Sequence, residues 1–300
     1  MIIIFLVTAL IIFFLLFHTV IMTKKGSIIV NNQKRDFRLH IPKKFDPNKK
    51  YALIIALHGR GMNSLGMELY SDLSKKADKK DFIVVYPNGT ADSMGKNRSW
   101  NAGFCCNPAM DTYVDDIRFI NELIRYLNEK YNVQKKEIYV TGFSNGGMLA
   151  YKLSEASPKK FAGIAVISGA FNGSVIKGRP YLFLSKIEPI PVLIIHGMKD
   201  KNIPYDGSSG KHEDSSFLSY KKTVEFWVQN NSISVKPKSN ITKEYTENMY
   251  EQQGRSKVVS ILIKEGKHRW FGGFSQIFGI YNKDKINATK QVVSFFGLDK

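Results

Sequence analysis

Six short runs of mostly consecutive apolar residues place the strongest constraint on how this chain can fold. They lie at residues 51–57, 82–86, 138–141, 163–167, 192–196 and 258–263. Apolar runs without alternation are typical of parallel strands that are covered on both faces, because a strand with one wet face alternates apolar and polar residues. We therefore expect a mostly parallel central sheet.

Segments with helical periodicity separate several of these runs. Residues 114–131 place apolar side chains along one helical stripe, and residues 216–229 and 288–296 are predicted as further helices. The opening segment 27–41 is expected to form a hairpin or edge strands. Because helices that connect parallel strands cover the faces of the sheet, the pattern predicts one α/β domain over residues 26–300, with helices on both faces.

Residues 1–22 are set apart from this domain by their composition. They contain no Asp, Glu, Lys or Arg, and at about 1.5 Å per residue a helix of this length crosses a bilayer core of about 30 Å. We expect an N-terminal hydrophobic helix that serves as a transmembrane anchor or a signal peptide. The anchor is favoured because a signal peptide has a shorter apolar run and a basic start. Lys24 and Lys25 follow the segment, and positive charge tends to stay cytoplasmic, so the orientation is left open.

The chain is strongly basic, with 44 Lys and Arg against 26 Asp and Glu and a net formal charge of +18. Its lysine pairs are scattered and no recognition motif accompanies them, so we expect a solvated basic surface and no nucleic-acid partner. A non-catalytic module that adheres to anionic polymers or lipids stays open as an alternative. The sequence has no metal-ligand cluster and no phosphate-binding glycine loop, so no metal and no cofactor are predicted.

A candidate nucleophile lies where a predicted strand passes into a helix. Ser144 occupies the centre of a G-x-S-x-G pattern formed with Gly142 and Gly146. On such a sharp turn the serine hydroxyl stands above the sheet, and small neighbours are required because side chains there would collide with nearby backbone. The pattern predicts a catalytic serine, and the simpler alternative is a serine that only caps the helix.

A serine needs a base and an acid, which in the doubly wound hydrolase layout follow it in the order acid, then histidine. His268 follows a strand through a short loop, whereas His212 lies in a polar stretch, so His268 is the predicted base. Asp200 lies just beyond the strand at 192–196 and is the predicted acid. Asp206 and Glu213 are nearby alternatives.

The loop after residues 51–57 is predicted to bind the oxyanion of the reaction. Glycines in this loop allow its backbone to approach a substrate carbonyl closely. The expected donors are the backbone amide of Arg60 or Gly61 together with that of Asn145. His58 is expected to pack beneath the loop as a structural residue.

The remaining aromatic and sulfur-containing residues near these loops allow two interpretations. Trp100, Asn101 and Phe104 could line a substrate pocket, although Trp100 is equally well explained as a core residue. Free buried thiols are favoured for Cys105 and Cys106, because adjacent α-carbons lie about 3.8 Å apart whereas disulfides prefer about 5.5 Å.

Together these stretches resemble the polyhydroxybutyrate depolymerase-like esterases and their feruloyl esterase relatives in the α/β-hydrolase superfamily. The resemblance runs from about residue 51 to the C-terminus. The matching stretches are Leu57-His58-Gly59, Tyr86-Pro87, Trp100-Asn101-Ala102-Gly103, Cys105-Cys106, Val114-Asp115-Asp116, Gly142-Phe143-Ser144-Asn145-Gly146-Gly147, Ile195-His196-Gly197, Asp200, Pro204-Tyr205, His268, Trp270, Gly272 and Gly273. One departure is Phe271, which stands where relatives commonly have proline.

The resemblance implies an α/β-hydrolase fold with Ser144 as nucleophile, Asp200 as acid and His268 as base. Trp270 joins the candidate pocket residues. The expected activity is hydrolysis of a hydroxyalkanoate, feruloyl, acetyl or similar ester through an acyl-enzyme, and a serine peptidase on the same fold is the alternative enzyme. We expect an extracytoplasmic protein, secreted or anchored through residues 1–22, and the sequence predicts no oligomeric state.

Overall fold

The computed structural model describes residues 23–157, 159–174, 187–208, 216–273 and 286–299. The predicted hydrophobic helix at residues 1–22 lies outside the described residues. Within the described part of the chain, no helix is both long enough and apolar enough to cross a membrane.

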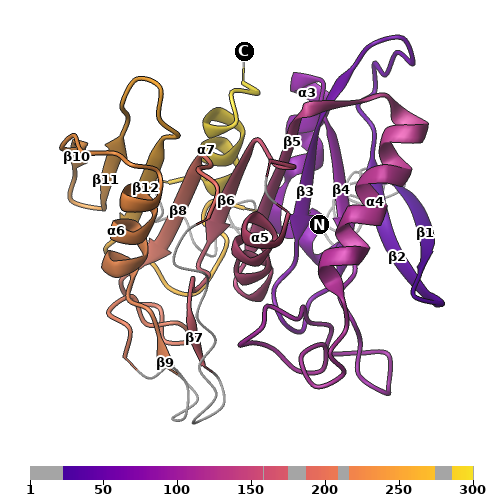
Figure 1. Ribbon diagram of the computed structural model, residues 1–300, viewed down its shortest axis with the longest axis horizontal. Coiled ribbons are helices and arrows are strands. Elements are labelled where there is room, and N and C mark those ends of the chain that lie inside the picture. Colours follow the sequence, from indigo (N-terminus) through magenta and orange to yellow (C-terminus); the bar gives the residue numbers. More distant parts are fainter. Residues whose placement is uncertain (1–22, 158, 175–186, 209–215, 274–285, 300) are drawn as a thin grey trace, which may run out of the picture.

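One mixed sheet organises the described residues (Figure 1). Its ten strands lie in the order β1-β2-β4-β3-β5-β6-β8-β12-β11-β10, and every neighbouring pair from β4 to β12 is parallel. Antiparallel strands complete both edges, and β7 and β9 form a separate two-stranded ribbon. The strands are β1 Lys24–Val30, β2 Gln33–His40, β3 Tyr51–Leu57, β4 Ile83–Pro87, β5 Val133–Phe143, β6 Gly163–Ile167, β7 Gly173–Ser174, β8 Val192–Gly197, β9 Ser216–Phe217, β10 Lys238–Ile241, β11 Tyr245–Tyr250 and β12 Val258–Ile263.

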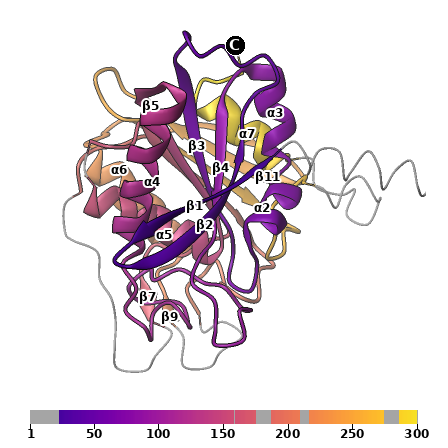
Figure 2. The ribbon, with the colours of Figure 1, turned by 90° about the vertical axis from the view of Figure 1, so that its right-hand side faces the viewer.

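Helices cover both faces of this sheet. Figure 2 shows α4, α5 and α6 on one face and α2, α3 and α7 on the other. The helices are α2 Ser64–Ser71, α3 Leu73–Lys80, α4 Asp116–Tyr131, α5 Asn145–Ala156, α6 Tyr220–Asn230 and α7 Ala288–Phe295. This arrangement confirms the predicted α/β class and the mostly parallel sheet.

The two faces of the sheet carry separate hydrophobic cores, because successive residues of a strand point to opposite sides. In β3, Leu53 and Ile55 belong to the core beneath α4, α5 and α6, whereas Ala52 and Ile54 belong to the core beneath α2, α3 and α7. Every residue of β3 is buried. Burial on both faces explains why the apolar runs do not alternate.

The predicted elements differ from the observed ones in a few places. The helix expected at residues 216–229 is wrong at its start: Ser216 lies in strand β9, and α6 begins only at Tyr220, where the Ser219 side chain caps it. The short helices α2 and α3 were not predicted. The reason is plain in α3, whose eight residues LSKKADKK offer Leu73 and Ala77 as the only apolar side chains.

A buried ion pair joins the β2 edge of the sheet to the loops above it. Arg35 Nη2 in β2 lies 2.7 Å from Asp116 Oδ1 at the start of α4, and both side chains are largely excluded from solvent. Asp116 Oδ2 also accepts the backbone N–H of Asn101 at 2.8 Å. Burial raises the pKa of Asp116, and the charge of Arg35 opposes that rise. The pair therefore ties the loop that follows β4 to the body of the domain.

We expect Arg35→Ala to lower the free energy of unfolding by about 3–5 kcal/mol, because it leaves a buried carboxylate without its partner. The control is Arg125→Ala, which removes an exposed pairing with Glu122 and Glu129 and should lower the free energy of unfolding far less. Urea unfolding followed by circular dichroism measures both. Equal losses in the two variants would contradict a stabilising role for the buried pair.

Candidate active site

Ser144 occupies a strained turn between the end of β5 and the start of α5. Its φ of 53° and ψ of −121° place it in a region that residues with a side chain rarely adopt. Its backbone N–H donates to Ile167 O at 2.9 Å in the neighbouring strand, which fixes the turn. A Cβ at Gly142 would collide with the backbone of Gly146, and one at Gly146 would collide with the carbonyl of Leu57. Gly142 and Gly146 are therefore required, because the end of β5, the start of α5 and the end of β3 approach one another too closely for a side chain.

The structure brings the three predicted reactive side chains into one hydrogen-bonded series. His268 Nε2 lies 2.9 Å from Ser144 Oγ, and His268 Nδ1 lies 2.7 Å from Asp200 Oδ2. Ser144 follows β5, Asp200 follows β8 and His268 follows β12, so each comes from the carboxyl end of a parallel strand. The remaining oxygen of Asp200 accepts backbone N–H groups of Asn202 and Ile203, both at 2.9 Å. Asp200 is thus held rigidly behind the histidine.

The other candidates for acid and base do not reach this position. Asp206 is exposed, and its carboxylate accepts the N–H and hydroxyl of Ser208 in its own loop. Glu213 and His212 lie outside the described residues. Within the described part of the chain, Asp200 and His268 are the acid and the histidine that the geometry joins to Ser144.

A second histidine lies on the other side of Asp200. His196 Nε2 donates to Ile203 O at 2.8 Å and is 3.5 Å from Asp200 Oδ2. Because a carbonyl only accepts, this nitrogen carries a hydrogen. Burial lowers the pKa of His196, which favours the neutral ring. His196 therefore braces the loop that carries the acid.

The candidate oxyanion loop follows β3. The Gly61 N–H already donates to Arg98 O at 2.8 Å, so this hydrogen bond favours Arg60 over Gly61 as the amide open to a substrate. The amide of Asn145 lies at the N-terminus of α5, where the helix dipole favours negative charge. The Asn145 side chain fixes the adjacent loop by exchanging two hydrogen bonds with the Trp100 backbone, at 2.8 and 3.0 Å.

His58 supports this loop from below, in agreement with its predicted structural role. Its Nδ1 donates to Gly59 O at 2.8 Å, and its Nε2 accepts the N–H of Gly89 at 2.9 Å, so the ring is neutral. Burial lowers the pKa of His58 to about 4. The indole of Trp100 packs on this ring and donates to His58 O at 2.9 Å.

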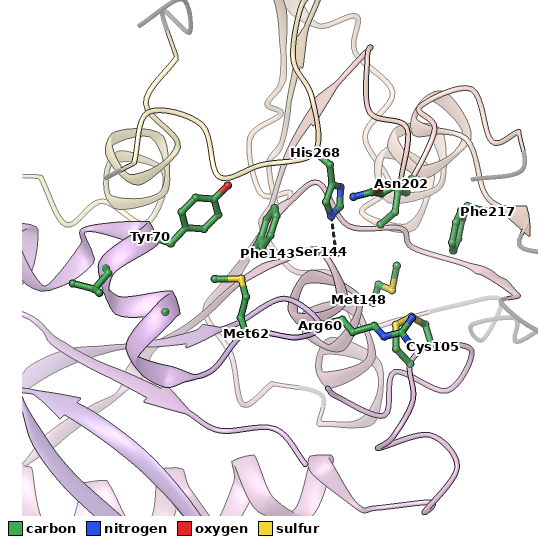
Figure 3. Close-up of a pocket in the computed structure, with 14 residues that line it drawn as sticks. Arg60, Met62, Tyr70, Cys105, Phe143, Ser144, Met148, Asn202, Phe217 and His268 are labelled. Atoms are coloured by element: carbon green, nitrogen blue, oxygen red, sulfur yellow. Dashed lines mark hydrogen bonds between the residues drawn. A yellow bond between two sulfur atoms is a disulfide. The ribbon is translucent and has the colours of Figure 1, made fainter. Parts of the chain in front are cut away.

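A cavity of about 620 Å³ opens at the Ser144–His268 pair (Figure 3). Its lining is mostly apolar and comes from the candidate oxyanion loop, α2, the loop before α4, the turn at the serine, α5, β9 and the loops after β8 and β12. The lining residues are Arg60, Met62, Gly66, Leu69, Tyr70, Cys105, Cys106, Phe143, Ser144, Met148, Asn202, Ile203, Phe217 and His268.

The pocket residues expected from the sequence do not line this cavity. Trp100 and Trp270 are completely buried and Phe104 nearly so. Trp270 donates from its indole to Thr289 Oγ1 at 2.9 Å. The Asn101 side chain binds backbone groups of its own loop instead of pointing into the cavity. These four residues support the loops from behind, and for Trp100 the structure favours the core alternative.

The expectation of free thiols was also wrong. The structure pairs Cys105 with Cys106 in a disulfide between adjacent residues. The bond forms although the α-carbons of the pair are only 3.1 Å apart, closer than the spacing that disulfides usually have. The pair forms part of the cavity wall.

Comparison with known proteins is decisive for the family. A family model described as "Putative esterase" matches residues 29–275. The chain belongs to this esterase family. Among the described residues of this esterase, no group of three or more His, Cys, Asp or Glu side chains is arranged to hold a metal ion.

Individual relatives agree with the family match. This esterase is 27% identical to "Putative esterase NocK" of Nocardia uniformis, over 84% of this chain and 75% of the relative. It is 26% identical to "Probable feruloyl esterase C" of Aspergillus clavatus, over 80% of this chain and 78% of the relative. The solved acetyl xylan esterase from Aspergillus awamori shares the fold, with a TM-score of 0.62 and 14% identity over 92% of this chain and 99% of that one. The chain is thus a carboxylic ester hydrolase of the α/β-hydrolase superfamily.

The buried His58 under the candidate oxyanion loop predicts a pH dependence of stability. As the pH falls below about 6.5, the unfolded chain binds a proton at His58 but the folded chain does not until the pH nears about 4, so the free energy of unfolding falls across that window. In His58→Gln this dependence should weaken by about 1.4 kcal/mol per pH unit between pH 6 and 5. Urea unfolding at a series of pH values measures the slope.

The same two proteins provide an internal control above about pH 8, where His58 is neutral in both states and their slopes should coincide. An unchanged slope between pH 6 and 5 in the variant would show that His58 takes up its proton equally in the folded and unfolded chains.

Proposed function

We propose that this esterase works through an acyl-enzyme, with Ser144 as nucleophile, His268 as general base and acid, and Asp200 as the carboxylate that orients the histidine. The observation that supports this most strongly is the unbroken series of hydrogen bonds from Ser144 Oγ through the imidazole to Asp200. A cap or a structural serine has no need of this series, whereas acyl transfer requires it.

In the first half of the reaction, Ser144 Oγ attacks the ester carbonyl while His268 Nε2 takes the hydroxyl proton. Asp200 accepts from Nδ1 and stabilises the imidazolium. The backbone amides of Arg60 and Asn145 stabilise the negative charge on the carbonyl oxygen. The C–O bond to the alcohol then breaks, and the departing oxygen takes the proton from His268.

In the second half, water replaces the alcohol. His268 removes a proton from the water as it attacks the acyl carbonyl, the same amides stabilise the second oxyanion, and the bond to Ser144 Oγ breaks. The serine recovers its proton from His268 and the carboxylic acid leaves. Each half uses the histidine once as base and once as acid.

The cavity favours an ester larger than an acetyl group. A volume of about 620 Å³ lies within the range of about 300–1,000 Å³ that is usual for sites enclosing a sizeable organic ligand. Tyr70 and Phe143 meet edge to face with ring centroids 5.4 Å apart beside the serine. Of the predicted classes, feruloyl or similarly aromatic esters suit this wall best, with hydroxyalkanoate and acetyl esters as the alternatives.

We also propose, from the sequence, that residues 26–300 form the catalytic domain and that residues 1–22 carry it to a membrane as an anchor or a signal peptide. The apolar character of these 22 residues supports this proposal. In this proposal the catalytic domain is extracytoplasmic, either secreted or anchored through residues 1–22.

An ester panel tests the proposed chemistry. We expect the protein to hydrolyse methyl ferulate and short 4-nitrophenyl esters, and Ser144→Ala to lower kcat by at least about 10³-fold with its circular dichroism spectrum unchanged. Asp200→Asn should lower kcat by about 10²–10⁴-fold. The exposed Ser208 provides the matched control, since Ser208→Ala should keep full activity. Undiminished turnover by folded Ser144→Ala would contradict the proposal.

A further inference from the structure

One side of the cavity is apolar. In Figure 3, Met62, Tyr70 and Phe143 lie together on one side of the Ser144–His268 hydrogen bond. The polar end of Tyr70 is already used, because its hydroxyl accepts the N–H of Trp270 at 3.1 Å. This side therefore offers ring faces and a thioether to a substrate.

The opposite side of the cavity combines apolar and polar groups. Figure 3 shows Arg60, Asn202, Met148, Phe217 and Cys105 there, with the Arg60 side chain running toward Cys105. Arg60 and Asn202 are both exposed and both line the cavity. A carboxamide and a guanidinium thus share the side that the aromatic rings do not occupy.

The charge of Arg60 is not balanced within the cavity wall. Among the described residues, no hydrogen bond or ion pair of its guanidinium is found, in contrast to Arg35 and Arg38, which bind buried carboxylates. None of the lining residues that the structure describes is Asp or Glu, and Asp200 is fully enclosed behind His268. The fixed charge that this wall presents to a substrate is therefore positive.

We propose that Arg60 makes this esterase selective for esters that carry a carboxylate, with the apolar part of the substrate on the Tyr70 side and the carboxylate on the Arg60 side. The planar guanidinium can donate two parallel hydrogen bonds to a carboxylate, and contact with an ionised group strengthens each of them. The inference rests on the proposed function, because it concerns the substrate of the same site.

The net charge of the whole chain gives a second way to attract anions, and it must be separated from this contact. A charge of +18 raises the encounter rate with any anion, but salt screens this effect beyond about 8 Å at physiological ionic strength. A direct contact with Arg60, in contrast, is lost when that one side chain is replaced. Lys201 is an exposed cation beside Asn202 that does not line the cavity, so it is a matched control for loss of one positive charge.

Two pairs of synthetic esters test the selectivity at 0.15 M salt. One pair is 3-carboxyphenyl and 3-carbamoylphenyl butanoate, which differ in the alcohol part, and the other is the mono-4-nitrophenyl ester of glutaric acid and that of its monoamide, which differ in the acyl part. In at least one pair we expect kcat/KM of the wild type to favour the carboxylate about tenfold. Arg60→Gln should bring the ratio near one, Arg60→Lys should keep part of it, and Lys201→Gln should keep all of it.

Three results would overturn this role for Arg60: equal kcat/KM within both pairs in the wild type, a ratio that survives in Arg60→Gln, or an equal fall in Lys201→Gln. In each case Ser144-dependent turnover of the neutral esters would leave the proposed function intact. If the wild type hydrolysed none of the four esters, nor methyl ferulate, nor 4-nitrophenyl butanoate, both proposals would be overturned together.

Discussion

The backbone turn at Ser144 is the constraint on which the rest of the site depends. A residue with positive φ stands between β5 and α5, where the chain passes so close to its neighbours that Gly142 and Gly146 have no room for a side chain. The turn lifts the hydroxyl toward His268 and places the Asn145 amide at the end of a helix dipole. Strain of this kind persists because hydrogen bonds on both sides hold the turn.

The parallel sheet brings together residues that are distant in the sequence. Asp200 and His268 are far from Ser144 in sequence, but the strands β5, β6, β8 and β12 are neighbours in the sheet. The loops that follow these parallel strands therefore meet at the same end of the sheet. Buried hydrogen bonds then hold each loop: Ile203 and His196 around the acid, and His58 beneath the oxyanion loop. The positions of the three proposed catalytic side chains are thus set by the fold more than by local sequence.

This division explains what the sequence could predict. Apolar runs revealed the strands because burial on both faces leaves a local signature, and the order of Ser144, Asp200 and His268 followed from the layout of such sheets. The cavity wall had no such signature. Trp100 and Trp270 are apolar whether they line a pocket or fill a core, and Tyr70 comes from a short helix with weak periodicity. The Cys105–Cys106 bond joins adjacent residues, whose α-carbons are closer than in most disulfides, so spacing in the sequence argued against it.

The most direct test of the central claim is covalent labelling with a fluorophosphonate, followed by peptide mass spectrometry. Attack by Ser144 Oγ forms a serine–phosphorus bond and releases fluoride, and His268 takes the hydroxyl proton. The account predicts one adduct, on the peptide that contains Ser144, formed at least about 100-fold more slowly in His268→Gln. An adduct on another serine, or an unchanged rate in that variant, would contradict it.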